Sequence, residues 1–228
     1  MTKRKVSNPL ALAVLACLWE HPMHPYEIAS TLRERGKDQS IKLNYGSLYT
    51  VVEALQHHAL IVAQETEREG RRPERTIYRL TDAGRMELID WISELLSIPV
   101  KEYTHFEAGL SLAGVLSPED IAALLTQRCN RLELEISQQR TILQLMRERG
   151  LARLFVIESE YSVSMQEAEL AWTRSLADEI RSGTLADLDL WTAMRQALEE
   201  ENQRRLEREQ SEPATPEIAR TEDTEDEE

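Results

Sequence analysis

The amino-acid sequence predicts a mainly α-helical protein with one two-stranded hairpin in its N-terminal third. Only 8 glycines and 8 prolines occur in 228 residues, and Leu, Glu, Ala and Arg dominate, which is typical of helical proteins. Apolar residues recur at helical spacing over most of the chain, and two short segments rich in β-forming residues interrupt this pattern once. Because no apolar run reaches transmembrane length and no signal peptide is evident, we expect a cytoplasmic protein.

The first two predicted helices are short and punctuated by proline and glycine. The segment SNPLALAVLACLWEHP places Pro9 at the first helical position, and its nearly continuous apolar run predicts a central, buried helix. The segment MHPYEIASTLRERGK predicts a second helix that begins near Pro25 and stops at Gly36. These two segments are therefore expected to be consecutive helices of one core.

The third predicted helix, in IKLNYGSLYTVVEAL, carries an unusual glycine. Asn44 is a good N-cap, which puts Gly46 in the first turn. One face is an apolar stripe of Leu48, Val51, Val52 and Leu55; the opposite face carries Gly46, Tyr49, Thr50, Glu53 and His57. Glycine costs ~1 kcal/mol against alanine in a helix, so it suggests close approach of another surface, such as phosphate, to the helix start. A loosely packed helix start is the alternative.

A hairpin and a fourth helix follow. LIVAQETERE and ERTIYRLT are rich in β-formers and are joined by the basic turn GRRP. Thr81 and Asp82 then cap a helix that ends before Pro99. Three helices, a hairpin and a helix within residues 1–98 are the order of a winged helix-turn-helix, whose recognition helix enters the major groove of DNA.

Residues 99–208 are predicted to be helical throughout, with seams that suggest dimerisation. Ser117 caps a long helix that has Pro118 at its first position. Apolar residues at coiled-coil spacing must bury against each other or against a second subunit. The predicted dimerisation residues are Leu125, Leu132, Ile136, Leu143, Met146, Tyr161, Met165 and Trp172. Another helix is expected near 184–208, and residues 209–228 are expected to form a disordered acidic tail.

The net charge of −14 is unevenly distributed along the chain. Residues 1–80 carry 12 Lys and Arg against 9 Asp and Glu, whereas the remaining 148 residues carry 15 against 32. A mildly basic segment joined to an acidic remainder favours a binding module on an acidic body. Acidic helices are also common as well-solvated ones, so the asymmetry supports DNA binding without establishing it.

Three segments together resemble the PadR family of transcriptional regulators: LACLWEHPMHPYEIASTLRERG, LNYGSLYTVVEAL and GRRPERTIYRLTDAGR. The resemblance covers roughly residues 10–95. It implies a homodimeric winged-helix repressor that binds a palindromic operator and is released by a small effector. It also implies a C-terminal helical dimerisation domain, which the helical pattern of residues 100–182 matches. Pro25 stands where the family usually has glycine, and proline suits a first helical turn.

The resemblance and the residues themselves indicate the same DNA-binding surface. Hydroxyl groups on the third helix can bond to phosphates or base edges, and the wing arginines can follow the phosphate backbone. The predicted DNA-binding residues are Lys42, Asn44, Tyr45, Gly46, Ser47, Tyr49, Thr50, Arg71, Arg72 and Arg75. Three arginines at a hairpin tip can also be a merely solvated turn. Lys3, Arg4 and Lys5 are either an arm that touches the duplex or a frayed terminus.

Other kinds of site have less support in the sequence. The five histidines show no recognised ligand spacing, so we expect no metal and no other cofactor. Cys17 and Cys129 are expected to be buried free thiols. Trp91, Trp172 and Trp191 either line an effector pocket or pack in a core. We find no catalytic motif and expect no enzyme. The rival function is a winged helix used for protein–protein contact, which would not need the basic turn GRRPER.

Overall fold

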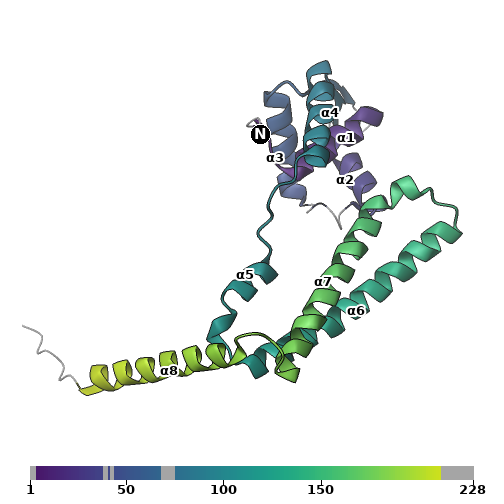
Figure 1. Cartoon of the computed structure of the whole chain (residues 1–228). Coiled ribbons are helices and arrows are strands. Elements are labelled where there is room, and N and C mark those ends of the chain that lie inside the picture. Colours follow the sequence, from purple (N-terminus) through teal and green to yellow (C-terminus); the bar gives the residue numbers. More distant parts are fainter. Residues whose placement is uncertain (1–3, 38–40, 42–43, 68–74, 212–228) are drawn as a thin grey trace, which may run out of the picture. The chain divides into compact units, whose positions relative to one another are not determined.

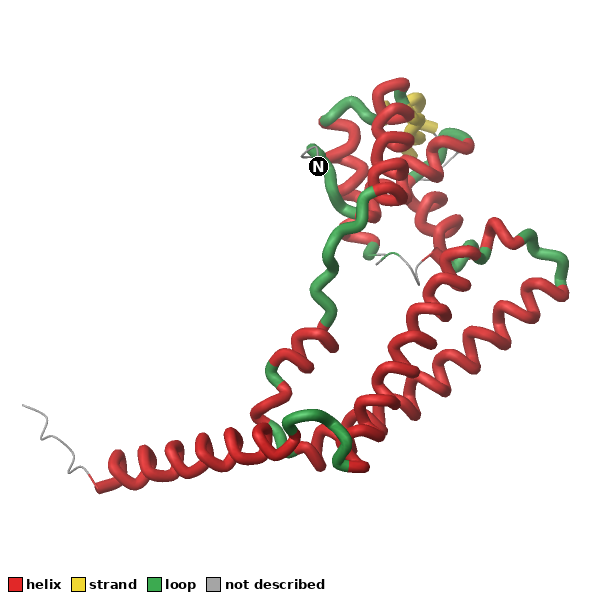
Figure 2. The backbone as a smooth tube through the Cα atoms, viewed as in Figure 1, coloured by secondary structure: helices red, strands yellow, loops and turns green. Residues whose placement is uncertain are grey.

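The computed structural model of the chain describes residues 4–37, 41, 44–67 and 75–211. The chain divides into two compact units, Met1–Glu102 and Tyr103–Glu228. The two strands of the described residues belong to the first unit and are drawn in yellow in Figure 2. Of the helices in the described ranges, none is long and apolar enough to cross a membrane.

The first unit contains the helices and the hairpin in the order predicted from the sequence (Figure 1). Its elements are α1 (Pro9–Glu20), α2 (Pro25–Glu34), α3 (Tyr45–His57), β1 (Ile61–Glu67), β2 (Arg75–Leu80) and α4 (Asp82–Ser97). The predicted winged helix-turn-helix architecture, with a two-stranded wing, is therefore confirmed.

α1 is the central helix of the first unit. The side chain of Asn8 caps it by accepting a hydrogen bond from the backbone N–H of Leu10 at 2.9 Å. Leu10, Val14 and Leu15 are almost completely buried in a core shared with α2, α3, β1 and α4. Cys17 is also buried there, and burial raises the pKa of its thiol to about 11. The apolar run in the sequence thus belongs to a helix that its neighbours surround.

The hairpin is fixed to the helices at its base. β1 and β2 pair antiparallel, with Ile61 opposite Leu80. Tyr78 of β2 also exchanges two backbone hydrogen bonds of 3.0 Å with Met23, which lies between α1 and α2 and is buried. This additional pairing holds the base of the wing against the helix-turn-helix. Tertiary contacts therefore help to set the orientation of the base of the wing.

α4 is attached to the start of the wing through Thr81 and Gly84. The Thr81 hydroxyl accepts a hydrogen bond from the Gly84 N–H at 3.0 Å and donates to the Leu60 carbonyl at 2.9 Å. Gly84 lies so close to the backbone of Leu60 that a Cβ atom at position 84 would be 2.0 Å from the Leu60 carbonyl oxygen. The absence of a side chain at position 84 therefore allows α4 to pack here.

The second unit is helical in its described residues (Figure 1). Its elements are α5 (His105–Ser111), the short 3₁₀ helix η2 (Ala113–Val115), α6 (Pro118–Glu148), the 3₁₀ helix η3 (Arg153–Phe155), α7 (Ile157–Ser182) and α8 (Leu188–Ser211). Ser117 caps α6, as predicted, because its hydroxyl accepts a hydrogen bond from the Asp120 N–H at 3.0 Å.

α6 and α7 pack along each other and bury apolar residues in two clusters. Leu132 and Ile136 of α6 pack in one cluster with Val163 and Leu170 of α7. A second cluster joins the other ends of the two helices; its buried members are Ile121, Ala122, Leu125, Ala177 and Ile180. The α6 seam predicted from the sequence is therefore buried largely within one chain.

Ion pairs between α6 and α7 show that the two helices run antiparallel. Near their connection, Arg147 lies 2.9 Å from Glu160. Far from it, Arg128 Nε donates to Glu169 at 2.5 Å. The hydrogen bonds from Arg147 and Arg153 hold the pKa of Glu160 below its usual range. Exposed pairs of this kind contribute little to stability, so the buried apolar residues account for most of the stability of this helix pair.

α8 packs on this helix pair only at its start. Leu188 and Trp191 lie against the cluster at the start of α6, whereas every residue in 196–211 is exposed. Pairs between successive turns, such as Glu200 with Arg204, support this exposed part. The helix reaches residue 211, so it extends past the predicted end at 208.

Two predicted boundaries differ from the observed ones in detail. The sequence puts the division between the two regions after residue 98, directly after the end of α4, whereas the two compact units divide after Glu102. Residues 209–211 are helical, and 212–228, which make up the rest of the tail predicted to be disordered, lie outside the described residues.

Candidate nucleic-acid interface

The candidate interface begins at the N-terminus of α3. The Asn44 side chain accepts a hydrogen bond from the Gly46 N–H at 3.0 Å, so Asn44 is the N-cap, as predicted. One turn later, the Thr50 hydroxyl donates to the Gly46 carbonyl at 3.2 Å. The first N–H groups of a helix have no partners inside it and lie at its positive end. This end of α3 can therefore receive an anion such as a phosphate.

α3 has one buried face and one exposed face. Leu48, Val51, Val52 and Leu55 lie in the core of the first unit. The exposed face carries five of the predicted DNA-binding residues, namely Asn44, Gly46, Ser47, Tyr49 and Thr50. The fold thus brings these five residues together on one accessible surface, where each polar group can reach a ligand.

The other predicted DNA-binding residues are described in part or not at all. Lys42, Arg71 and Arg72 lie outside the described residues. Tyr45 and Arg75 are placed only through their backbones, as the first residues of α3 and β2. The base of the wing can therefore be described, whereas the position of its basic tip stays a prediction.

Tyr78 connects the base of the wing with the exposed face of α3. Its ring is partly buried, and burial, followed by the negative charges of Glu53 and Tyr49, raises the pKa of its hydroxyl. Glu53 and Tyr49 belong to α3, so charges on α3 act on a residue of β2. The first strand of the wing, β1, packs against α3.

Neither Tyr78 nor Glu53 is among the residues predicted to contact DNA. The position of Tyr78 depends on its pairing with Met23, which no local pattern in the sequence reveals. Glu53 could have been included, because helical spacing alone puts it on the same face as Tyr49 and Thr50. DNA-binding residues are usually predicted from basic and hydroxyl side chains, because these bind phosphate. A carboxylate such as that of Glu53 is repelled by phosphate and was therefore not predicted.

One residue of the basic segment Lys3, Arg4 and Lys5 has a structural role. Arg4 bonds to three carboxylates of α4: Glu87 at 2.5 Å, Asp90 at 3.0 Å and Glu94. Its guanidinium also lies over the ring of Trp91, and its side chain is only 7% exposed. Arg4 is therefore neither a frayed residue nor one that is free to touch a duplex. Lys5 is exposed, and Lys3 lies outside the described residues.

The predicted dimerisation residues divide into buried and exposed groups. Four residues of α6 are buried within the chain: Leu125, Leu132, Ile136 and Leu143. The remaining four, which are at least 37% exposed, are Met146 of α6 and Tyr161, Met165 and Trp172 of α7. Three of the four exposed residues lie on α7, so this side of α7 is accessible in the single chain.

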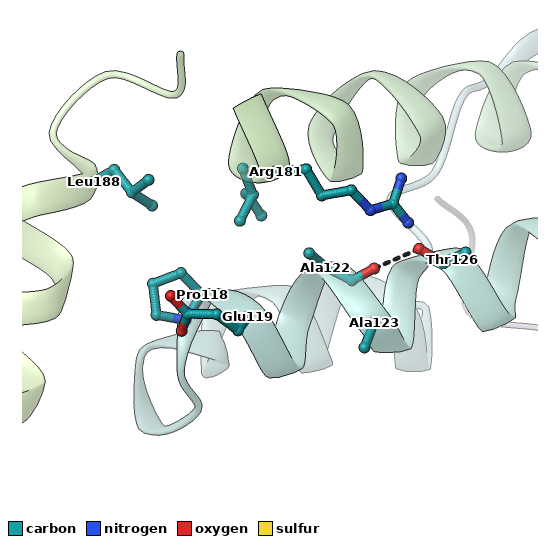
Figure 3. A pocket seen from close by; sticks show the side chains of 8 residues that line it. Pro118, Glu119, Ala122, Ala123, Thr126, Arg181 and Leu188 are labelled. Carbon is teal, nitrogen blue, oxygen red and sulfur yellow. Dashed lines mark hydrogen bonds between the residues drawn. The ribbon is translucent and has the colours of Figure 1, made fainter. Parts of the chain in front are cut away.

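A hollow lies where the start of α6, the end of α7 and the start of α8 meet (Figure 3). Its volume of about 590 Å³ is in the range of small-molecule pockets. The walls are mostly apolar, and the guanidinium of Arg181 extends above α6 toward Thr126. Arg181 also pairs with Asp178 at 3.0 Å, on an exposed surface where such a pair is weak.

The three tryptophans considered for an effector pocket have different surroundings. Trp91 is buried in the core of the first unit, and Trp191 packs on the cluster at the start of α6. Trp172 is half exposed and meets Phe106 edge to face at 6.2 Å. None of the three lines the hollow of Figure 3. Within the described ranges, no group of three or more His, Cys, Asp or Glu side chains is arranged to hold a metal ion.

Comparisons with known proteins agree with this geometry. Residues 14–90 match the family model described as the transcriptional regulator PadR-like family. No curated protein matches the sequence significantly. Among solved structures, the chain is similar to Bacillus subtilis PadR in complex with operator DNA, with a TM-score of 0.62 and 20% identity over 76% of this chain and 99% of that chain.

Two further structures have the same fold. One is Bacillus subtilis PadR in complex with p-coumaric acid, with a TM-score of 0.61 and 17% identity over 75% of this chain and 98% of that chain. The other is the PadR-like transcriptional regulator BC1756 from Bacillus cereus, with a TM-score of 0.52 and 16% identity over 76% of this chain and 99% of that one. The residues 14–90 that match the model of the PadR-like family of transcriptional regulators include α2, α3 and both strands of the wing.

Proposed function

We propose that this chain is a sequence-specific DNA-binding repressor whose α3 enters the major groove while the wing contacts phosphates. The observation that carries the proposal is the exposed polar face of α3, with Gly46 at its start and an apolar face held in the core. A helix presented in this way can reach base edges, and its N-terminus can reach phosphate. Similarity to a PadR structure in complex with operator DNA supports the same function.

The proposal includes a homodimer on a palindromic operator. Its support is the half-exposed apolar face of α7, because a contiguous apolar face on one helix is typical of a subunit contact. A dimer with two-fold symmetry would present two α3 helices to two half-sites and therefore fits a palindromic operator. A cytoplasmic location follows, because such a regulator has to reach chromosomal DNA.

The proposal further includes release from DNA by a small effector. A related structure holds p-coumaric acid. In this chain, the hollow at the junction of α6, α7 and α8 is one place to test for an effector site. It offers an apolar wall and the guanidinium of Arg181, which can pair with a carboxylate.

The alternative is a winged helix that binds a protein partner and has no operator of its own. The acidic second unit favours it, because acidic helices can bind a basic partner. The basic turn sequence and the glycine at the start of α3 favour DNA, because phosphate attracts positive charge and requires close approach.

A shift assay on DNA upstream of the chain's own gene tests the proposed function. The purified protein should shift this fragment in the presence of excess unrelated DNA, and footprinting should then reveal two half-sites about one helical turn, or a multiple of it, apart. Equal binding to upstream and unrelated DNA over a range of salt concentrations would leave the protein–protein alternative.

A further inference from the structure

Glu53 is an acidic residue on a surface that the proposed function presents to DNA. It is exposed and lies at the i+7 position relative to Gly46, with Tyr49 and Thr50 at i+3 and i+4. A recognition helix reads the major groove with residues at this same spacing, i, i+3, i+4 and i+7, because they lie along one face. If α3 is the recognition helix, then Glu53 faces base edges.

Other glutamates of the first unit have partners within the chain. Glu20 pairs with Arg35, and Glu34 accepts a hydrogen bond from Ser30 at 2.9 Å. For Glu53, the described residues offer no ion pair and no hydrogen bond to its carboxylate. Its described interaction is the electrostatic one with Tyr78 of β2. Within the described part of the chain, the carboxylate of Glu53 is therefore available to a ligand.

A carboxylate in this position has restricted chemistry toward DNA. An ionised glutamate only accepts hydrogen bonds, so phosphate oxygens and the acceptor atoms of guanine and thymine repel it. In the major groove, donors are the exocyclic amino groups of cytosine and adenine, and acidic side chains pair with the cytosine N4 amino group. A negative charge at this position would weaken binding to all DNA. Only a base pair that donates a hydrogen bond to the carboxylate can compensate for this loss.

We propose that Glu53 is a specificity-determining residue that accepts a hydrogen bond from the N4 amino group of one cytosine in each half-site of the operator. This inference rests on the proposed function. It assigns to Glu53 two effects of opposite sign. Its carboxylate lowers affinity for DNA in general through repulsion from phosphates, and it raises affinity for the one sequence that offers the amino group.

The test compares the parent, Glu53→Ala and the charge-matched control Glu201→Gln, which changes an exposed residue of α8 in the second unit. Each full-length protein is titrated against the footprinted operator, a scrambled fragment, and operators in which each C·G pair of both half-sites is replaced in turn by T·A. Thymine carries an acceptor, O4, in the major groove where cytosine carries the amino group.

We expect Glu53→Ala to bind the operator about tenfold more weakly and scrambled DNA more tightly than the parent, since a good base contact contributes about 5- to 150-fold. One C·G replacement should weaken the parent by a similar factor and leave Glu53→Ala unaffected, while Glu201→Gln behaves as the parent. The role of Glu53 is refuted if the parent prefers the operator to scrambled DNA and Glu53→Ala keeps both this preference and the parent's response to every C·G replacement. The proposed function stands in that case. A parent that does not prefer the operator to scrambled DNA refutes the proposed function, and this role of Glu53 with it.

Discussion

At residue 84, α4 approaches the backbone of Leu60, directly before β1, so closely that only glycine fits. A Cβ atom there would lie 2.0 Å from the Leu60 carbonyl oxygen and 2.9 Å from the Leu80 side chain. We predict that Gly84→Ala lowers the free energy of unfolding by at least about 3 kcal/mol, since backbone atoms yield less readily than side chains. Urea unfolding followed by circular dichroism measures it.

The matched control for Gly84→Ala is Gly46→Ala in the same unit. A Cβ atom at position 46 would meet only the Asn44 side chain, at an ordinary 3.6 Å. Its effect on stability should therefore be small, and gain of helix propensity can make it favourable by up to ~1 kcal/mol. Similar unfolding midpoints for the two variants would contradict the close packing at Gly84.

Arg4 is a second single residue on which the first unit depends. Glu87, Asp90 and Glu94 all bond to it, and Glu94 is largely buried. Arg4→Ala should lower the free energy of unfolding by about 2–4 kcal/mol, because it leaves a partly buried carboxylate without its cation. Arg4→Lys should recover only part of this, since an ammonium group cannot bridge three carboxylates as a guanidinium does.

Thermal melting of Arg4→Ala beside Lys5→Ala checks this prediction. Lys5 is adjacent and exposed, so its removal changes the charge by the same amount without breaking the α4 contacts. Equal melting temperatures for the two variants would show that the bonds of Arg4 do not contribute to stability.

At the scale of elements, the wing is predicted to contact the DNA backbone. Arg71 and Arg72 lie outside the described residues, but β1 at the base of the wing packs against α3. Arg71→Ala combined with Arg72→Ala should weaken specific and non-specific binding alike. The slope of log K against log[salt] should become shallower by about one for each lost phosphate contact.

The control for the wing removes two arginines elsewhere. Arg204→Ala combined with Arg205→Ala changes net charge equally on the exposed part of α8. Anisotropy titrations at several salt concentrations compare the two double variants. An unchanged slope for the wing variant, or an equal change in both, would mean that the wing does not contact phosphates.

The elements themselves were largely predictable from the sequence, because their signals are local. Asn44, Thr81 and Ser117 cap the helices as predicted, since each cap bonds to an N–H within three residues. Which element covers a given apolar face of a helix could not be predicted in the same way. The predicted stripe of α7 that includes Tyr161 and Met165 is exposed, whereas a neighbouring face packs on α6. Periodicity shows that a face is apolar, and it does not show what covers that face.

At the scale of the whole molecule, we predict a dimer held through the exposed face of α7. Tyr161 is 67% exposed and Met165 is 49% exposed in the single chain. Changing both to arginine should convert the protein to a monomer that remains folded, because neither side chain belongs to the core of a single chain. Sedimentation velocity measures the oligomeric state, and circular dichroism checks the fold.

The control for this dimer prediction has the same spacing on another helix. Leu190→Arg combined with Met194→Arg changes two apolar residues of α8, each 58% exposed. This variant should remain a dimer. A dimer in the Tyr161 and Met165 variant would place the subunit contact elsewhere.

The parts of the candidate site that come from one short segment could be predicted from the sequence. The parts that combine distant segments could not. The cap, the glycine and the hydroxyl groups of α3 lie within seven consecutive residues, and the fold presents them together. The neighbourhood of Tyr78 and Glu53 joins segments that are distant in the sequence, so it required the tertiary structure. Arg4 was misjudged for the same reason, because its carboxylate partners lie more than 80 residues away.

The central claim, that the start of α3 contacts DNA, is tested most directly on Gly46→Leu by measuring operator affinity and melting temperature on the same preparation. Position 46 is exposed and opposite the buried stripe, and leucine is the better helix former, so the melting temperature should hold or rise slightly. Operator binding should be lost, because the side chain would hold phosphates and base edges beyond hydrogen-bond distance. Operator binding equal to that of the parent, or lost only together with folding, would contradict the claim.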